Sequence, residues 1–378
     1  MDNIRKTQHL IRLTDSSDMS LIDSGSVQLV VTSPPYPMIE MWDHQFISKN
    51  QDIRELIGKG RGFDAFECMH SQLDRVWDEV YRILEPGCFA CINIGDAART
   101  INKDFRLFPN HAMILNHLVK TGFLPMPSIL WRKQTNAPNK FMGSGMLPGG
   151  AYVTLEHEHI LILRKGSKRE FKTQAQKELR RKSAIFWEER NQWFSDIWFD
   201  LKGTTQKLIS QKERKRSGAF PFALPYRLIN MYSIQGDTVV DPFLGIGTTT
   251  MAAMAAARNS VGYELEKNVM NSIEERITPS GELLNTVVFK RLKSHQDFVC
   301  ARKETGKELK HFNGVYQTEV VTNQEKNICF KKIDKISFKK RKKMFLVSHA
   351  IMDHKSSDEP QKQYKKPKPG TQQALFLN

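Results

Sequence analysis

The stretch DPFLGIGTT, residues 241–249, decides the fold of this chain. The apolar run Thr238-Val239-Val240 precedes it and the helix-forming run from Thr248 to Ala257 follows, so a buried strand passes directly into a helix. Gly245 and Gly247 let the backbone turn tightly and approach a ligand, while the first amide groups of the helix point back toward that ligand. The pattern predicts a ligand-binding turn at the carboxyl end of a parallel strand.

An acidic residue follows this turn at the spacing that is typical of ribose binding. The next strand, residues 260–263, ends at Glu264, about 20 residues after the glycines, where an acidic residue can accept hydrogen bonds from two ribose hydroxyls. Thr250 replaces the third glycine of the dinucleotide fingerprint, and no lysine follows as in a phosphate-binding loop. We therefore expect a ribose-containing ligand and no ATP hydrolysis. The alternative is a turn that uses glycine for its geometry alone.

A second short motif, SPPY at residues 33–36, ends another buried strand, residues 26–32. Two successive prolines cannot donate the hydrogen bonds of a sheet, so the strand must stop there. The Ser33 hydroxyl and the Pro34 carbonyl can accept hydrogen bonds side by side, which suits an amino group with two N–H donors. Tyr36 offers a face on which a planar base can stack. A proline-rich surface turn is the alternative for these four residues alone.

The remaining patterns alternate between strands and helices. They predict helices at 66–84, 111–120 and 221–232 and strands at 88–94, 129–131 and 159–163. This alternation favours an α/β fold with a mostly parallel sheet covered on both faces. Beyond about Thr278, short alternating stretches such as NTVVFKRL predict a β-rich, basic extension, and the last 25 or so residues have a composition typical of disorder.

Taken together, SPPY, the downstream DPFLGIGT and Tyr263-Glu264 resemble the family of DNA amino-methyltransferases that modify the N4 of cytosine or the N6 of adenine. The order of the motifs, with a basic insert between them, resembles the permuted arrangement called the beta class, over roughly residues 8 to 270. The resemblance implies a Rossmann-like S-adenosylmethionine-dependent methyltransferase sheet with circularly permuted motif order. It divides the chain into a catalytic half (1–163), a target-recognition insert (164–217), a cofactor-binding half (218–278), a basic extension (279–352) and a disordered tail (353–378).

The resemblance also implies site residues. Asp241 and Phe243 would contact the methionine end of S-adenosyl-L-methionine, and Glu264 would bind its ribose. Asp15 stands where the family often has Gly-Asp-Ser near the adenine, although Thr14 replaces the glycine here. The expected catalytic residues are Ser33, Pro34, Pro35 and Tyr36, and the expected cofactor-binding residues are Asp15, Asp241, Pro242, Phe243, Gly245, Gly247, Thr248 and Glu264. No metal site is expected.

The first letter of the SPPY motif bears on the substrate. Within the family, serine in this place is typical of cytosine enzymes, whereas aspartate or asparagine is typical of adenine enzymes. Ser33 therefore favours methylation of cytosine N4 in duplex DNA after base flipping, with adenine N6 on the same fold as the alternative. The chain contains no Pro-Cys dipeptide, which excludes carbon-5 cytosine methylation. A noncatalytic DNA-binding protein that keeps the fold, and an enzyme that methylates RNA or protein amides, also stay open.

The net charge of +16 is confined to two segments. Residues 164–216 carry a net +9 and residues 331–368 another +9, so the rest of the chain sums to −2. The first segment is expected to hold the double-stranded DNA substrate through Arg164, Lys165, Lys168, Arg169, Arg180, Arg181, Lys182, Arg214, Lys215 and Arg216. The run from Lys339 to Lys343 favours nonspecific DNA affinity, with RNA binding or no specific partner as alternatives.

Composition sets the remaining expectations. No apolar run approaches the roughly 18 residues needed to cross a bilayer, the first ten residues lack a signal-peptide pattern, and five scattered cysteines argue against disulfides. We therefore expect a cytoplasmic protein with no membrane partner. A restriction–modification role would add a cognate endonuclease, and the sequence leaves both that partner and the oligomeric state open.

Overall fold

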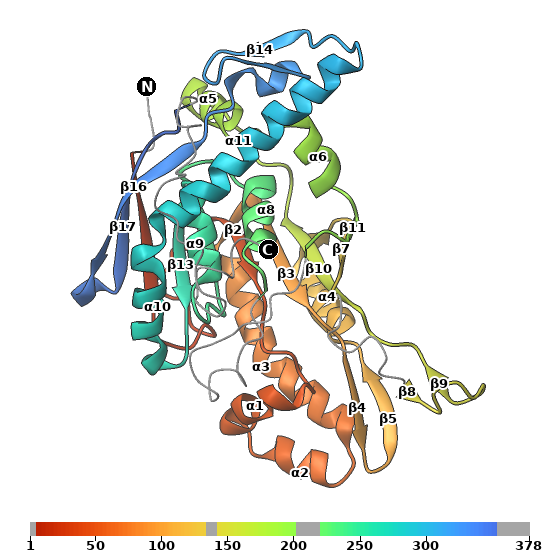
Figure 1. Ribbon diagram of the computed structural model, residues 1–378. Helices are drawn as coiled ribbons and strands as arrows, with labels where there is room; N and C mark the ends of the chain where they lie inside the picture. Colours follow the sequence, from red (N-terminus) through yellow and green to blue (C-terminus); the bar gives the residue numbers. More distant parts are fainter. Residues whose placement is uncertain (1–4, 134–141, 202–219, 354–378) are drawn as a thin grey trace.

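A computed structural model describes residues 5–133, 142–201 and 220–353 (Figure 1). Its centre is one sheet, with β6 (Phe123–Pro125) paired to β10 beside the main path. Along that path the strands are β11 (Ile197–Trp198), β7 (Ile129–Arg132), β10 (His157–Lys165), β3 (Leu84–Ile94), β2 (Val27–Thr32), β12 (Thr238–Asp241), β13 (Asn259–Tyr263), β1 (Lys6–Arg12), β17 (Met344–Ile351) and β16 (Lys331–Lys339).

The five central strands, from β3 to β1, are mutually parallel. Their flanking strands run the other way, since β10 is antiparallel to β3 and β17 is antiparallel to β1. We call the side at which the five central strands end the carboxyl edge, and the opposite side the amino edge. Ligands of such sheets bind outside the carboxyl edge, so this geometry fixes where the site must lie.

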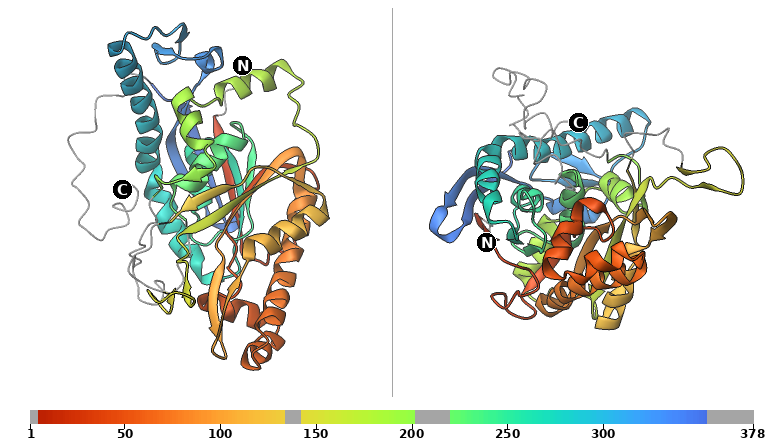
Figure 2. Two further views of the ribbon diagram at one scale, coloured as in Figure 1. Left: turned by 90° about the vertical axis from the view of Figure 1, so that its right-hand side faces the viewer. Right: turned by 90° about the horizontal axis from the view of Figure 1, so that it is seen from below.

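Helices cover both faces of the sheet, as the alternation predicted (Figures 1 and 2). Successive strand residues point to opposite faces, and Val30 packs with the core on one face while Leu29 and Val31 join the core on the other. The first core includes α3 (Gly62–Ile83) and α4 (Asn110–Thr121), and the second includes α8 (Ala223–Tyr232), α9 (Thr248–Ala255) and α11 (Gly281–Glu304). The other α-helices among the described residues are α1 (Asp43–Lys49), α2 (Asp52–Gly58), α5 (Gln174–Lys182), α6 (Trp187–Trp193) and α10 (Met270–Ile277).

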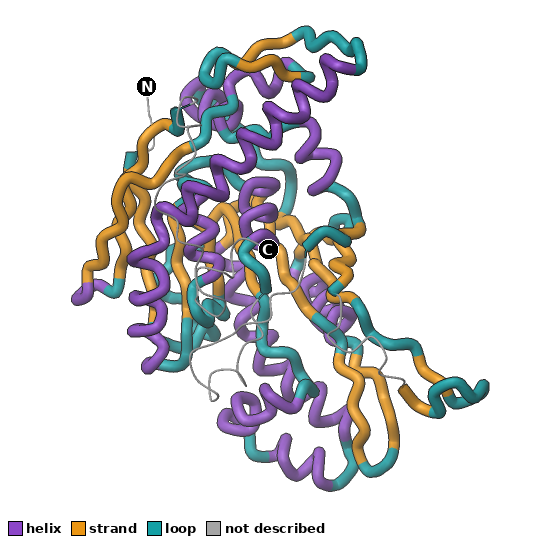
Figure 3. The backbone as a smooth tube through the Cα atoms, in the orientation of Figure 1, coloured by secondary structure: helices purple, strands orange, loops and turns teal. Residues whose placement is uncertain are grey.

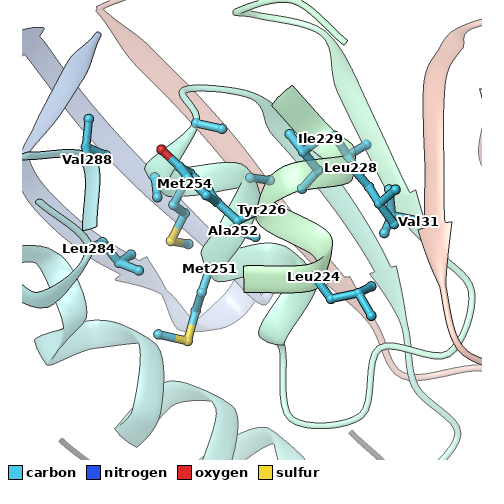
Figure 4. Packing of buried hydrophobic residues seen from close by; sticks show 14 of the residues in the cluster. Val31, Leu224, Tyr226, Leu228, Ile229, Met251, Ala252, Met254, Leu284 and Val288 are labelled. Atoms are coloured by element: carbon cyan, nitrogen blue, oxygen red, sulfur yellow. The ribbon is translucent and has the colours of Figure 1, made fainter. Parts of the chain in front are cut away.

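The second core is closely packed (Figure 4). Leu224 and Leu228 of α8 lie near Val31 of β2, and Met251 of α9 lies toward Leu284 of α11. All five side chains are completely buried. This layer fixes α9, and therefore the glycine turn that precedes it, on the sheet.

Most predicted helices and strands are confirmed, with ends that differ by a few residues, but β1 was not predicted. Its inward positions include Thr7 and His9, which are fully buried yet polar. Their side chains hydrogen-bond to each other at 2.9 Å, and His9 also contacts Ser260 of β13 at 2.9 Å. Because polar residues occupy these positions, the apolar alternation of a buried strand is missing from the sequence.

The prediction of a β-rich extension is wrong for its first part. Residues 281–304 form α11, a helix of 24 residues (Figure 3). Its buried residues Leu284, Val288, Leu292 and His295 recur every three or four positions, which is a helical period that the local apolar pairs concealed. Two later parts meet the expectation: β14 (His311–Asn313) and β15 (Thr318–Val320) pair with each other, and β16 and β17, within residues 331–351, form a hairpin that joins the main sheet.

Arg291 anchors α11 to the rest of the molecule. Its guanidinium donates two hydrogen bonds to Glu189 of α6, at 2.6 and 2.8 Å, and a third to the Tyr226 hydroxyl of α8 at 3.1 Å. The cation also lies 4.4 Å from the ring centre of Phe330. Since both charged side chains are about 90% buried, each one depends on the other to offset its loss of hydration.

We predict that Arg291→Met lowers the free energy of unfolding by about 3–5 kcal/mol, because it leaves the Glu189 carboxylate buried and unpaired. The double variant Arg291→Met, Glu189→Met should recover a large part of this loss. Urea unfolding followed by circular dichroism measures both. A double variant no more stable than the single variant would contradict the buried-pair explanation.

Candidate active site

Two loops meet at the carboxyl edge, because the strands that lead into them are neighbours. Residues 33–36 follow β2, and residues 242–247 follow β12. The Thr32 hydroxyl at the end of β2 donates a 2.6 Å hydrogen bond to Asp241 at the end of β12. The Thr249 hydroxyl donates to the other carboxylate oxygen at 2.6 Å, and the Phe243 amide donates at 3.0 Å. The Asp241 carboxylate therefore joins both loops to the start of α9.

Burial raises the pKa of Asp241, although its hydrogen bonds from Thr249, Thr32 and Phe243 act in the opposite direction. The residue is only 3% exposed and does not border the cavity described below. The expectation that Asp241 contacts the cofactor stays a prediction. Thr248 and Gly247 also do not border this cavity, and Arg276 donates a 3.2 Å hydrogen bond to the Thr248 hydroxyl.

A cavity opens between the two loops. Its wall contains seven of the predicted residues, which are Asp15, Ser33, Pro35, Pro242, Phe243, Gly245 and Glu264. Seven that were not predicted come from the segment around α1 and from α3, namely Trp42, Gln45, Phe46, Lys49, Gln72, Leu73 and Val76. No local motif marks these seven residues, so they enter the site only because of how α1 and α3 pack.

Glu264 is held in place by backbone amides. Its carboxylate accepts hydrogen bonds from the Gly245 amide at 2.9 Å and from the Glu266 amide at 2.8 Å. Gly245 has φ +55° and an added Cβ would meet nothing within 4 Å, so glycine is needed there for the conformation of the turn. Burial raises the pKa of Glu264, and the amide hydrogen bonds only partly offset this effect.

Asp15 faces the same cavity and forms an ion pair with Lys49 at 2.6 Å. It also accepts a 2.9 Å hydrogen bond from the Ser17 amide. Burial alone would raise the pKa of Asp15, but the hydrogen bonds from Lys49 and Ser17 and the charge of Lys49 lower it overall. Asp15 therefore presents an ionised carboxylate to the cavity.

The hydroxyl group of Tyr36 is the centre of a buried network. It donates a 2.9 Å hydrogen bond to Glu158 and lies 2.9 Å from the Asn93 side-chain amide and 3.1 Å from the Ser33 hydroxyl. Glu158 is 7% exposed and also accepts hydrogen bonds from Asn93 at 2.7 Å and from Lys133 at 2.7 Å. Burial, and after it the charge of Glu158, raises the pKa of Tyr36 well above its ordinary value, so the phenol keeps its proton.

The network fixes the direction of the Ser33 hydroxyl. Tyr36 has one proton and gives it to Glu158, so its oxygen can only accept from Ser33. Once the Ser33 proton is used in this way, the lone pairs of its oxygen are free to accept a hydrogen bond from a ligand. Gly95 permits this packing, because an added Cβ there would lie 2.9 Å from the Tyr36 ring.

Sequence reasoning missed Asn93, Lys133 and Glu158 as site residues. Asn93 lies on a predicted strand and Glu158 immediately precedes another. Both segments were interpreted only as strands that pack in the sheet. A carboxylate immediately before the apolar run HILIL was the available signal, since a charged residue in a buried strand usually has a specific partner.

The described cations at the start of the basic insert, residues 164–182, lie away from this cavity. Arg164 of β10 pairs with Phe89 near the start of β3, so the chain leaves the sheet at the amino edge. The Lys165 ammonium donates to the carbonyls of Tyr81 and Leu84 at 2.6 and 2.8 Å, and Arg169 forms two hydrogen bonds with Asp237, at 2.7 and 2.9 Å. These contacts hold the insert to the protein itself.

The part of the insert that leads to α5 continues along the same edge. The Gln235 amide, just before β12, donates to the hydroxyl of Ser183 at the end of α5, so α5 with Arg180, Arg181 and Lys182 also lies there (Figure 1). Lys168 is exposed on the same side. Arg214, Lys215 and Arg216 lie outside the described residues. Beyond α6, β11 is parallel to β7 and runs back toward the carboxyl edge, with Trp198 beside Trp131. That the basic residues of the insert hold the DNA substrate stays a prediction.

One cluster near the Tyr36 network has metal-ligand chemistry. Ligand atoms of Asp96, His111 and His159 lie within 4.8 Å of one another. The two imidazole rings are stacked, with centroids 3.9 Å apart and 14° between their planes, and His111 hydrogen-bonds to Asp96 at 2.8 Å. Burial, with the neighbouring His111, lowers the pKa of His159 to about 4. Stacked rings direct their in-plane lone pairs along parallel lines, which does not suit the convergence that one ion requires.

Two general expectations concern the whole chain. Among the residues that the structure describes, no helix is long and apolar enough to cross a membrane. The five cysteines are free thiols.

Comparison with known proteins agrees with this site. The DNA methylase family matches residues 27–275, about two thirds of the chain. The chain is 51% identical over 324 residues to the type II methyltransferase M.MthZI of Methanothermobacter thermautotrophicus, covering 85% of this chain and 90% of that protein. It is 49% identical over 282 residues to the type II methyltransferase M.MjaI of Methanocaldococcus jannaschii, covering 72% of this chain and 91% of that protein.

A solved structure supports the fold. A candidate DNA modification methylase of Thermus thermophilus, solved with S-adenosyl-L-methionine, is 32% identical and gives a TM-score of 0.56 over 71% of this chain and 95% of that one. The same family is supported by the mixed sheet, by the neighbouring SPPY and glycine loops and by these relatives. The chain belongs to the N6_N4 DNA methylase family.

Proposed function

We propose that this protein is a site-specific DNA methyltransferase that transfers a methyl group to the N4 amino group of cytosine in duplex DNA. The observation that carries the proposal is the orientation of Ser33, whose hydroxyl proton is used by Tyr36 and whose oxygen can accept a hydrogen bond from an amino group. The target nitrogen lies inside a base pair, so the base must be flipped out of the helix to reach Ser33.

S-adenosyl-L-methionine is the cofactor, and the residues of the cavity suit it. The Glu264 carboxylate can accept hydrogen bonds from the ribose hydroxyls, beside the open side of Gly245. Asp15 offers an acceptor for the amino group of an adenine, and Phe243 supplies an aromatic wall. When bound, this cofactor supplies an electrophilic methyl group. Ser33 and Pro35 line the same cavity, so the residues that hold the base border the space that holds the cofactor.

The amino group of cytosine is a poor nucleophile, because its lone pair is conjugated with the ring. Ser33 Oγ and the Pro34 carbonyl would each accept one N–H hydrogen bond and favour a more tetrahedral nitrogen, whose lone pair is available. The N–C bond then forms as the methyl group leaves its sulfur, and the nitrogen afterwards loses a proton. Positioning is the main catalytic contribution of these residues.

The duplex would approach the carboxyl edge. Two hairpins extend from this side, β4 (Ala97–Ile101) with β5 (Asp104–Phe108), and β8 (Met142–Gly143) with β9 (Ala151–Tyr152) (Figure 1). Phe105 and Tyr152 stack at 4.6 Å and join the two hairpins. Exposed Leu147 and Met146 at the second tip are the kind of apolar side chains that enter base stacks when DNA is bent or opened.

The biological setting follows from the relatives. Both similar proteins are named type II methyltransferases, which supports a role as the modification enzyme of a restriction–modification system, in the cytoplasm and with a cognate endonuclease. Adenine N6 methylation on the same fold is the second candidate.

We predict that DNA methylated by the purified protein yields N4-methylcytosine. Incubation of unmethylated duplex DNA with the protein and S-adenosyl-L-methionine, digestion to nucleosides and mass spectrometry identify the product. N6-methyladenosine as the only product would contradict the assignment of cytosine, and the absence of any methylated nucleoside would favour a noncatalytic DNA-binding protein.

Tyr36→Phe should lower kcat about tenfold, because it removes the acceptor that orients Ser33, a loss of the order of one hydrogen bond. The dissociation constant of the cofactor should change less than twofold. Ser33→Ala, which removes the acceptor for the amino group itself, should cost at least as much. Single-turnover methylation and isothermal titration calorimetry give the two quantities. If either variant lost cofactor affinity in proportion to turnover, the roles assigned to this network would be wrong.

Cofactor affinity should fall as the pH is lowered, beginning above the ordinary glutamate pKa of about 4.3, because the pKa of Glu264 is raised and the protonated form is a poorer acceptor. Asp15, whose pKa is lowered, stays ionised over the same range. Calorimetric titrations between pH 5 and pH 8 test this effect. Glu264→Gln should bind the cofactor more weakly at pH 8 and should show little pH dependence; an unchanged dependence would assign the effect to another group.

A further inference from the structure

The C-terminal hairpin brings a cationic turn to the side of the active site. β17 is antiparallel to β1, with Met344 opposite Leu10 and Ser348 opposite Lys6. Because β1 runs toward the carboxyl edge, the turn between β16 and β17 lies at that edge (Figure 1). The Ile11 amide donates a 2.9 Å hydrogen bond to the Lys343 carbonyl, which fixes the turn to the end of β1.

We name residues 339–343 the basic turn. Its five consecutive residues are all cationic and all exposed, namely Lys339, Lys340, Arg341, Lys342 and Lys343. None of the ion pairs found among the described residues involves any of them. The turn is also well supported, since the rings of Phe338 and Phe345 pack at its base with centroids 4.7 Å apart. It therefore presents concentrated, unneutralised positive charge on a fixed hairpin.

The basic turn is close to the cavity. The Ile11 amide holds the Lys343 carbonyl, and Asp15 in the cavity wall lies four residues after Ile11. The chain from Ile11 to Asp15 spans at most about 14 Å. Successive phosphates on one strand of DNA are spaced about 3.4 Å along the helix axis. A duplex whose target base enters the cavity would thus place phosphates on the order of four base pairs away beside the basic turn. Figure 2, in the view from below, shows this hairpin and the β8–β9 hairpin on opposite sides of α1 to α3.

We propose that the basic turn binds the backbone phosphates of the duplex that is being methylated, on the flank of the target base. The proposal rests on the proposed function and adds the part of the chain that holds the substrate. Lysine and arginine side chains on phosphates hold the protein in register and carry no sequence information. The described cations of the insert at 164–182 lie at the amino edge and cannot serve the same duplex position.

The test compares two variants with the same change of charge. The turn variant carries Lys339→Gln, Lys340→Gln, Arg341→Gln and Lys342→Gln and keeps Lys343, whose φ of +47° belongs to the turn. The control variant carries Lys172→Gln, Lys177→Gln, Arg190→Gln and Lys307→Gln, exposed residues on or beside α5, α6 and the end of α11, which lie toward the amino edge (Figure 1). Each variant loses three lysines and one arginine, so any effect of net charge alone is equal in both.

Binding of the full-length proteins to a fluorescein-labelled, random-sequence duplex of 30 base pairs is measured by anisotropy between 50 and 200 mM KCl. Each phosphate contact contributes about 0.9 to the slope of log affinity against log salt. The turn variant should lose about 2 to 4 from the magnitude of this slope and bind at least tenfold more weakly at 100 mM KCl, while the control should keep its slope within about 0.5 of the wild type. An unchanged slope in the turn variant, or an equal loss in the control, would overturn the proposal.

Two further measurements separate this proposal from the proposed function. Cofactor affinity of the turn variant should equal that of the wild type, which shows that the fold and the cavity are intact. If the wild type methylates DNA but the turn variant keeps its salt slope, only the role of the basic turn fails. If the wild type methylates no DNA, the proposed function fails whatever the slope.

Discussion

The structure of the site depends on one buried carboxylate. Asp241 accepts hydrogen bonds from Thr32 at the end of β2, from Thr249 in the first turn of α9 and from the Phe243 amide of its own loop. Burying a carboxylate costs free energy unless such donors are present, and here three donors from three elements meet at one residue. The SPPY loop and the glycine loop are consequently held at a fixed distance, so the residues for the base and those for the cofactor border the same cavity.

A second network fixes the direction of a single hydroxyl. Lys133 and Asn93 donate to Glu158, which in turn accepts the proton of Tyr36. This order leaves the Tyr36 oxygen as an acceptor and makes Ser33 the donor to it. The prolines of the SPPY motif fix the conformation of its backbone. Side chains of β3 and β10, two strands from elsewhere in the chain, determine which groups of the motif donate hydrogen bonds and which accept them. Preorganised acceptors of this kind need little rearrangement when charge develops during a reaction.

The direction of the strands determines where each basic segment lies relative to the site. β10 and β17 are both antiparallel to the central strands, so both begin at the carboxyl edge and end at the amino edge. The chain after β10 therefore places its first cations at the amino edge, where Lys165 and Arg169 hold protein groups. The turn before β17 places Lys339 to Lys343 at the carboxyl edge, beside the cavity. Two segments of equal net charge thus have different positions relative to the site.

The sequence alone predicted the class of fold, the two loops and seven of the residues that line the cavity, because glycines, prolines and apolar periods act locally. It did not reveal β1, whose buried residues are polar, or α11, whose helical period was hidden by adjacent apolar pairs. Asp241 shows the limit most clearly: its place in the motif predicts contact with the cofactor, whereas its hydrogen bonds with Thr32 and Thr249, which join the two loops, are visible only in the tertiary structure. Glu158, Lys133 and the edge on which each basic segment lies depend on strand order and direction, and only the tertiary structure decides those, since they arise from pairing between residues far apart in the chain.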